Sequence, residues 1–234
     1  MQNTTLFRRM AALLLTVVLA VSAALPGLAV YEMPIQTANA GESVYLFNAD
    51  IDKPILDQNA GQQRYIASLT KMMTALLFLE SGKDLNEEIT IPTSLTQEFK
   101  DIQNANGSTM NLRIGETVRR IDLLYGLLVA SANDAASVIA NDVAGSLPNF
   151  VAMMNQKAQE LGCTGTHFVN PNGLHDPNHY STAWDIYLFT REAMKNETFM
   201  KICGTASYVV PATNMSEERE LYTTNSLISN WRIM

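Results

Sequence analysis

Apolar positions near the start of the chain follow the pattern of strands. Residues 43–47 have the composition of a strand and are followed by turn formers at residues 48–50. Residues 54–56 predict a second strand, which would form a hairpin with the first. Residues 88–92 and 207–211 predict two further short extended segments.

The middle of the chain is dominated by helical patterns instead. Met72 to Leu79 is an apolar run that surrounds the helix axis on nearly all sides, which predicts a buried helix from Ser68 to about Ser81. Four more helices are predicted at residues 117–130, 135–144, 148–161 and 182–195, the last one opened by a capping box at Thr182 and Asp185. Residues 93–115 and the residues after 211 are polar and predict irregular loops. The visible strands are few, although a two-stranded hairpin cannot bury its face alone.

A serine and a lysine lie three residues apart where the buried helix begins. Ser68 and Lys71 share one face of the first turn, so their side chains are close enough to touch. Burial of the lysine and the positive end of the helix dipole both favour a neutral amine. A neutral amine beside a serine hydroxyl is a general base beside a nucleophile. The structural alternative is that Ser68 caps the helix while the Lys71 amine extends to water.

A second polar group lies at the junction of two predicted helices. Ser131-Ala132-Asn133 occupies a position from which side chains are able to point into a cleft instead of a core. The functional interpretation is a hydroxyl and an amide that face the Ser68 site. The structural interpretation is a pair of N-caps for the following helix. The two motifs together are far more specific than either one.

Composition and charge limit the possible functions. The chain is 47% hydrophobic and 17% charged, which is typical of a globular protein. Its net charge of −7 and the absence of any Lys/Arg run argue against a nucleic-acid surface. Cys163 and Cys203 are too few for a disulfide framework, and we expect them to be unpaired. His175, Asp176 and His179 have a spacing seen in metal sites, but an intervening proline prevents a helical pair and no third ligand cluster follows, so we predict no metal site.

The first residues have the pattern of a secretory signal peptide. Arg8 and Arg9 precede an uncharged run from Met10 to Leu25, and small residues follow up to Ala29. We therefore expect a signal peptide at residues 1–29, a linker at 30–40 and an exported catalytic domain at 41–234. The competing interpretation is an uncleaved anchor, because the uncharged run is nearly long enough to span a bilayer. Either way the body of the protein is expected outside the cytoplasm, on the cell-wall or periplasmic side of the membrane.

These motifs, in this order, resemble the serine-type D-alanyl-D-alanine carboxypeptidases, the low-molecular-mass penicillin-binding proteins of the peptidase S11 family. S-x-x-K is a known signature element of that superfamily, and so is a serine and an asparagine two residues apart. The resemblance extends from about residue 41 to residue 225 and includes residues 67–74, 131–136, 166–168, 170–174 and 179–183. It implies an α+β fold of the β-lactamase/transpeptidase type, in which a helical cluster packs on an antiparallel sheet.

The resemblance also implies a mechanism. Ser68 would attack the carbonyl between the terminal D-alanines of a peptidoglycan stem peptide, and Lys71 would accept the serine proton. Ser131 would pass a proton to the departing D-alanine, while Asn133 would bind the substrate amide and orient Lys71. β-Lactams would acylate the same serine. No metal or organic cofactor is implied, and the expected location is the outer face of the cytoplasmic membrane and the cell wall.

Two departures from the family pattern change what we expect of this chain. Ile66 stands where the family usually has proline, which should alter only the approach to the helix. The third family motif, K-T-G, is absent, because no lysine after Asn133 is followed by Thr-Gly or Ser-Gly. In the family that motif lies on a C-terminal sheet strand and supplies a cation for the substrate carboxylate and half of the oxyanion hole. We therefore expect a truncated member, without its C-terminal sheet strands, that has feeble activity or none.

Two other functions fit part of the sequence. A non-catalytic cell-wall binding protein with the same cleft would explain the absence of K-T-G. A class A β-lactamase shares the first two motifs, but it usually has aspartate at the position of Ala132 and a downstream Glu-x-x-Leu-Asn run that this chain lacks.

Overall fold

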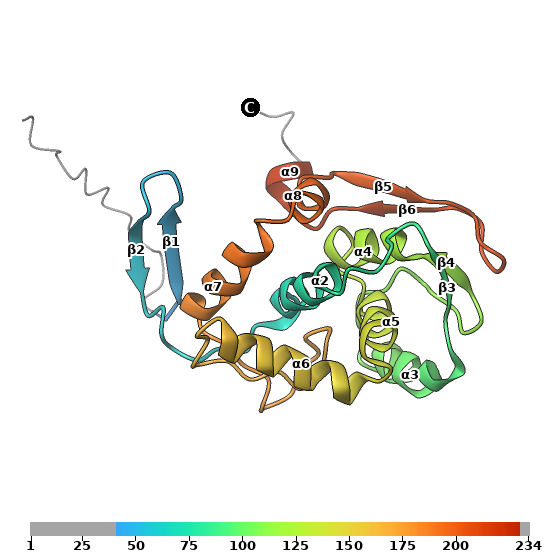
Figure 1. Ribbon diagram of the computed structural model, residues 1–234, viewed down its shortest axis with the longest axis horizontal. Helices are drawn as coiled ribbons and strands as arrows, with labels where there is room; N and C mark the ends of the chain where they lie inside the picture. The colour runs from blue at the N-terminus through green and yellow to red at the C-terminus, as the bar shows by residue number, and fades with distance from the viewer. Residues whose placement is uncertain (1–40, 230–234) are drawn as a thin grey trace, which may run out of the picture. The chain divides into compact units, whose positions relative to one another are not determined.

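Helix α2 (Thr70–Glu80) is the element around which the other helices pack. The computed structural model describes residues 41–229, which belong to one compact unit. Figure 1 shows α2 among four helices that contact it, α4 (Arg120–Leu128), α5 (Asn133–Ala144), α6 (Leu147–Glu160) and α7 (Ala183–Ala193). Every residue from 70 to 78 except Met72 is buried. The prediction of a buried helix is confirmed, because an all-round apolar helix is stable only when neighbours cover every face.

The helix begins two residues later than predicted. Ser68 lies in a separate 3₁₀ turn, η1 (Ala67–Leu69), and α2 starts at Thr70. The i to i+3 spacing still places Ser68 and Lys71 on one side, because side chains three apart align in a 3₁₀ turn as they do in an α-helix. The expected signal peptide at residues 1–29 and linker at 30–40 lie outside the described residues. Within residues 41–229, no helix has the length and apolar character to cross a bilayer.

The strands form three separate antiparallel pairs. They are β1 (Val44–Asn48) with β2 (Lys53–Gln58), β3 (Glu88–Thr90) with β4 (Thr117–Arg119), and β5 (Ser207–Val210) with β6 (Arg219–Tyr222). The first pair is the predicted hairpin, with Tyr45 opposite Asp57 and an irregularity between Leu46 and Phe47. The extended segments predicted at residues 88–92 and 207–211 contain β3 and β5, each of which ends before the proline.

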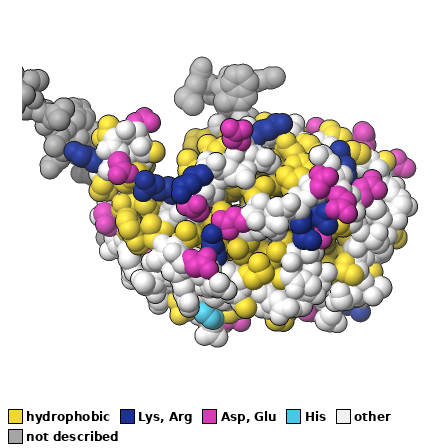
Figure 2. All heavy atoms as spheres, viewed as in Figure 1, with side chains coloured by type: hydrophobic (Ala, Val, Ile, Leu, Met, Phe, Trp, Pro, Cys, Tyr) yellow, Lys and Arg dark blue, Asp and Glu magenta, His cyan; other side chains and the backbone are white. Residues whose placement is uncertain are grey.

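Aromatic side chains fix the first hairpin to α7. The ring of Tyr45 lies 5.0 Å from that of Trp184 in an edge-on arrangement, and the rings of Phe47 and Tyr187 are 4.8 Å apart. Such pairs contribute about 0.5–1.5 kcal/mol beyond the area that they bury. A groove of about 750 Å³ runs between β1 and α7, and apolar side chains reach the surface on this face (Figure 2).

Several predicted boundaries were wrong. Residues 93–115, expected to be irregular, contain η2 (Thr93–Leu95) and helix α3 (Thr96–Asn104), whose apolar positions Leu95, Phe99 and Ile102 follow a helical spacing among many polar residues. Residues 117–119, expected to open a helix, form β4, because Val118 pairs with Ile89 of β3. The segments that the sequence did not predict are α3, α8 (Glu197–Cys203), β6 and the short helix α9 (Ser226–Ser229).

Helix α7 shows one half of the predicted capping box. The Thr182 hydroxyl accepts a hydrogen bond from the Asp185 backbone N–H at 3.0 Å. The Asp185 carboxylate does not return the bond; it accepts instead from the Gly165 N–H and the Thr166 hydroxyl, at 2.8 and 2.7 Å. A long-range contact therefore replaces the local one. Cys163 and Cys203 are free thiols, and burial raises the pKa of both.

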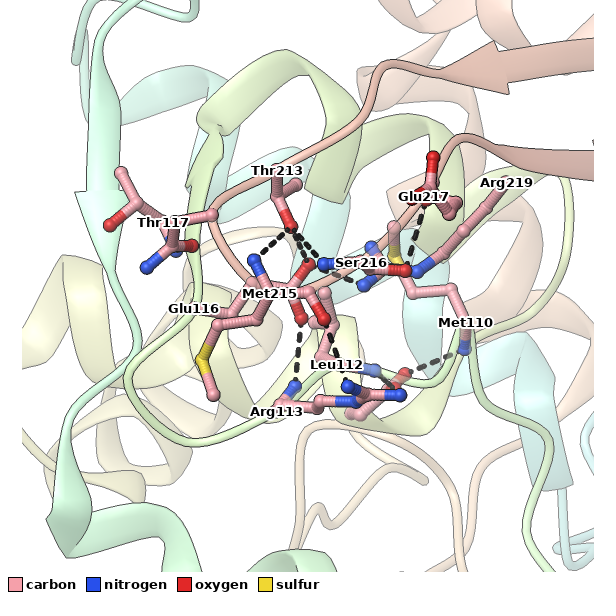
Figure 3. A network of polar contacts seen from close by, with 12 residues as sticks. Met110, Leu112, Arg113, Glu116, Thr117, Thr213, Met215, Ser216, Glu217 and Arg219 are labelled. Carbon is pink, nitrogen blue, oxygen red and sulfur yellow. Dashed lines mark hydrogen bonds and ion pairs between the residues drawn. The ribbon is translucent and has the colours of Figure 1, made fainter.

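The connection between β5 and β6 is attached to the segment before β4 by one buried carboxylate. Glu116 is fully buried, and its carboxylate accepts hydrogen bonds from the Thr213 hydroxyl at 2.8 Å and the Arg113 backbone N–H at 3.0 Å (Figure 3). It also forms an ion pair with Arg219. Arg113 in turn donates to the Met215 carbonyl at 2.9 Å. These contacts hold the strand pair that follows α8 against the middle of the chain.

Candidate active site

Ser68 is exposed on a turn whose backbone is tightly constrained. Ala67, just before it, has φ of +46°, which is unusual for a residue other than glycine. The Ala67 carbonyl lies directly against Gly173, where an added Cβ would sit 1.9 Å from the carbonyl oxygen. Gly173 also has φ of +86°. Only glycine fits there, both for space and for backbone conformation.

Lys71 is buried directly behind the serine. The residue is 2% exposed, and its Nζ lies 3.0 Å from Ser68 Oγ and 2.7 Å from the backbone carbonyl oxygen of Asn172. Burial lowers the pKa of Lys71 from 10.5 to about 8, and the negative charge of Asp134 partly opposes this. The spacing predicted this contact. The structural alternative does not hold, because Ser68 makes no capping hydrogen bond and Lys71 does not extend to water.

The loop of residues 170–179 contacts the start of α2 at several points. The Thr74 hydroxyl donates to the Pro171 carbonyl at 2.6 Å, one turn beyond the Lys71 contact with Asn172. His179 Nε2 lies 2.6 Å from the Thr70 hydroxyl, while its Nδ1 accepts from the Val169 N–H at 3.2 Å. Because Nδ1 accepts, the proton of the neutral ring is on Nε2. Burial lowers the pKa of His179 to about 4, so the ring is neutral at physiological pH.

The histidines of this loop therefore have structural contacts. Both nitrogens of His179 are occupied by hydrogen bonds, and His175 packs edge-on against Tyr65 with ring centroids 4.7 Å apart. No group of three His, Cys, Asp or Glu side chains in residues 41–229 is arranged to hold a metal ion.

Ser131 and Asn133 lie where α5 begins. Ser131 has φ of +55° and is partly buried, while Asn133 is the first residue of α5 and is 5% exposed. They are not N-caps, because the cap position belongs to Ala132 and no side chain caps the helix. The Asn133 N–H donates to the Ser108 carbonyl at 2.7 Å. Within the described part of the chain, neither side chain makes a hydrogen bond to Ser68 or Lys71.

Two contacts nevertheless place the first turns of α5 near Lys71. The buried carboxylate of Asp134 accepts from the backbone N–H groups of Met110 and Leu112, at 3.1 and 2.9 Å, and its charge acts on Lys71. One turn after Asn133, the Ser137 hydroxyl donates to Glu98 of α3 at 2.8 Å. The same Glu98 oxygen accepts from the Asn172 side chain at 3.2 Å, and the Asn172 carbonyl contacts Lys71.

Sequence reasoning did not assign a role to four residues of this site: Glu98, Asn172, Gly173 and His179. Residues 170–173 read Asn-Pro-Asn-Gly, which is typical of a turn, but nothing local indicates that a turn carbonyl would meet a lysine 101 positions earlier. Glu98 was assigned to an irregular loop. The amphipathic spacing of α3 was the one signal that would have placed it on a helix.

Comparison with known proteins identifies the family. The family model peptidase S11, described as D-alanyl-D-alanine carboxypeptidase, matches residues 31–233. This chain belongs to that family. The D-alanyl-D-alanine carboxypeptidase DacF of Bacillus subtilis is 33% identical over 193 residues, which cover 82% of this chain and 49% of DacF. The D-alanyl-D-alanine endopeptidase of Pseudomonas aeruginosa is 32% identical over 221 residues, covering 94% of this chain and 68% of that protein.

Solved structures agree with the family assignment. The DD-transpeptidase of Streptomyces K15 matches with a TM-score of 0.72 and 29% identity, over 80% of this chain and 74% of that one. Penicillin-binding protein 5 of Haemophilus influenzae matches with a TM-score of 0.66 and 30% identity, over 77% of this chain and 51% of that one. The expected α+β fold of the transpeptidase type is confirmed. This chain spans about half the length of DacF, and 33% of the Haemophilus influenzae carboxypeptidase DacA.

Proposed function

We propose that this chain is a serine D-alanyl-D-alanine carboxypeptidase that cleaves peptidoglycan stem peptides through an acyl-enzyme on Ser68. One observation carries the proposal. A buried lysine with a pKa of about 8 lies 3.0 Å from an exposed serine hydroxyl, within a chain of this family. The pair has the proximity and the proton affinity that an activated nucleophile requires.

The Asn172 carbonyl determines how Lys71 would act as a base. A neutral amine has two N–H groups and one lone pair. One N–H donates to Asn172 O at 2.7 Å, which anchors the nitrogen and leaves the lone pair free to accept the Ser68 proton across 3.0 Å. At pH 8 about half of the Lys71 amines would be neutral, given a pKa of about 8.

The reaction then proceeds by acyl transfer. Ser68 Oγ attacks the carbonyl carbon between the two D-alanines while Lys71 takes its proton. The bond to the terminal D-alanine breaks as Ser131 passes a proton to the leaving amine, and Asn133 binds the substrate amide. The Lys71 ammonium returns a proton to Ser131 and so becomes neutral again. Water then gives a proton to Lys71 as it attacks the ester on Ser68, and Lys71 passes that proton to Ser68 Oγ as the shortened peptide leaves. The roles of Ser131 and Asn133 rest on the family resemblance. They are supported by the next residue, Asp134, which is close enough for its charge to act on Lys71.

The K-T-G triplet, which supplies a cation and an oxyanion donor in the family, does not occur in these 234 residues. A site without one oxyanion donor typically reacts about 10²–10³-fold more slowly. For these 234 residues tested by themselves, we therefore expect slow acylation that still depends on Ser68.

A labelled penicillin tests the proposal, because β-lactams acylate the same nucleophile. The chain, Ser68→Ala and Lys71→Ala are incubated with the label for hours, and the modified peptide is identified by mass spectrometry. We expect slow labelling at Ser68, none at that site in Ser68→Ala and far less in Lys71→Ala. Equal labelling of the chain and Ser68→Ala would overturn the proposal. Release of D-alanine from a synthetic stem peptide, without turnover of a cephalosporin, would distinguish this activity from that of a β-lactamase.

We further propose that the protein acts outside the cytoplasm, at the cell wall. Arg8 and Arg9 followed by an uncharged run support export, and the proposed substrate is located there. Fractionation of expressing cells and N-terminal sequencing of the recovered protein test this. Recovery in the cytoplasm with an intact Met1 would contradict it.

A further inference from the structure

A single carboxylate oxygen connects α3, α5 and the loop whose carbonyl contacts Lys71. Glu98 lies in the first turn of α3, where a negative charge interacts favourably with the helix dipole. Its Oε1 accepts hydrogen bonds from the Ser137 hydroxyl of α5 at 2.8 Å and from the Asn172 amide at 3.2 Å. Asn172 is the residue whose backbone carbonyl receives the Lys71 amine. We propose that Glu98 is a positioning residue that holds the Asn172 carbonyl against Lys71 and so directs the amine towards Ser68.

The side chain of Asn172 is fixed at both ends. Its Oδ1 accepts from the Leu174 N–H at 2.9 Å, its Nδ2 donates to Glu98, and the residue is 1% exposed. Removal of Glu98 would leave a buried amide donor without an acceptor, which is costly enough to make the residue reorient. The carbonyl that contacts Lys71 belongs to the same residue, so it shifts when Asn172 reorients. The carbonyl at the other end of Asn172 would then leave its place 2.7 Å from Lys71.

The effect acts through geometry and not through charge. Glu98 makes no hydrogen bond to Ser68 or Lys71 among residues 41–229, and the charged group that acts on the Lys71 pKa is Asp134 of α5. A glutamine at position 98 would still offer one oxygen to both Ser137 and Asn172. The network therefore predicts that Glu98→Gln preserves the site and that Glu98→Ala does not.

The inference rests on the proposed function of Ser68 and Lys71, so the experiment uses two readouts. The first is the rate of Ser68 labelling by penicillin, for which we expect a loss of about tenfold in Glu98→Ala and a change of less than about twofold in Glu98→Gln. The control is Gln97→Ala, the adjacent α3 position, whose exposed side chain donates to Asp101. We expect this control to match the parent chain.

The second readout is the NMR titration of the Lys71 side chain, which requires no activity. A carbonyl acceptor favours the protonated amine, so its displacement in Glu98→Ala should lower the titration midpoint by roughly half a unit or more. If Glu98→Ala does not fold, Ser137→Ala, which removes one of the two donors to Glu98, should shift the midpoint in the same direction by less.

The outcomes separate the two hypotheses. Parent-like labelling and titration in Glu98→Ala would overturn the positioning role and leave the proposed function intact. A glutamine variant as defective as the alanine variant would also overturn it, because charge would then be the cause. No Ser68 labelling in the parent would count against the proposed function alone, and the titration would decide the role of Glu98.

Discussion

The pH dependence of Ser68 acylation tests the proposed catalytic pair most directly. Burial lowers the pKa of Lys71 from 10.5 to about 8. At pH 7 about one tenth of the amines would then be neutral, compared with about one in 3,000 for an ordinary lysine. The environment of Lys71 therefore raises the concentration of the base about 300-fold at this pH.

The direction of the pH dependence follows from which protonation form of Lys71 reacts. Only the neutral amine accepts the Ser68 proton, so the acylation rate should rise nearly tenfold per pH unit below pH 7, bend near pH 8 and level off above it. The assay is the rate of labelling by a fluorescent penicillin between pH 6 and pH 10, with the hydrolysis of the label measured separately at each pH. A rate that is independent of pH over this range, or a midpoint near 10.5, would refute the argument that burial creates the base.

The same pKa shift predicts how stability changes with pH. The folded Lys71 releases its proton near pH 8, whereas the unfolded chain keeps it to about pH 10.5, so between these values the unfolded state binds more protons. The free energy of unfolding should therefore rise with pH across this window, by about 3 kcal/mol in total. Below the window the buried amine is protonated, and the full cost of burying its charge lowers stability. Urea unfolding of Lys71→Met, which has no proton to lose, should show a weaker rise over the same window. An equal rise in both proteins would mean that another group is responsible.

Three further predictions concern the residues that shape the site. Gly173→Ala should destabilise the fold by several kcal/mol in thermal unfolding and displace the turn that carries Ser68. Gly145 also has a positive φ, of +73°, but an added Cβ there would meet open space, so Gly145→Ala should cost only about 1–2 kcal/mol. The pKa of His179 is lowered from 6.5 to about 4, so the free energy of unfolding should rise with pH between these values. In His179→Gln this rise should be smaller by about 3 kcal/mol. An unchanged rise would exclude His179 as its source. Glu116→Ala leaves Arg219 buried without its partner and should cost about 3–5 kcal/mol, while replacement of both residues by methionine should cost much less in urea unfolding. Equal losses in the single and double variants would show that the ion pair is not the cause.

The sequence by itself determined the features that depend on neighbours within one or two turns. The spacing of Ser68 and Lys71 was enough to predict their contact, whether the turn is 3₁₀ or α. The Thr182 cap and the helix end at Gly145 could also be predicted, because each depends on backbone groups a few residues away. The order of the motifs was sufficient to identify the family.

Tertiary structure decided the features that depend on distant partners. Residues 117–119 form a strand because β3 is available to pair with them, and β6 is a strand because β5 lies beside it. The lowered pKa of Lys71 has the same kind of origin. The packing around α2 buries the amine, and a loop 101 positions away along the chain supplies the Asn172 carbonyl that it contacts. Local sequence places a lysine next to a serine, but only packing removes the water that would otherwise keep the amine protonated, because desolvation depends on everything that surrounds the group.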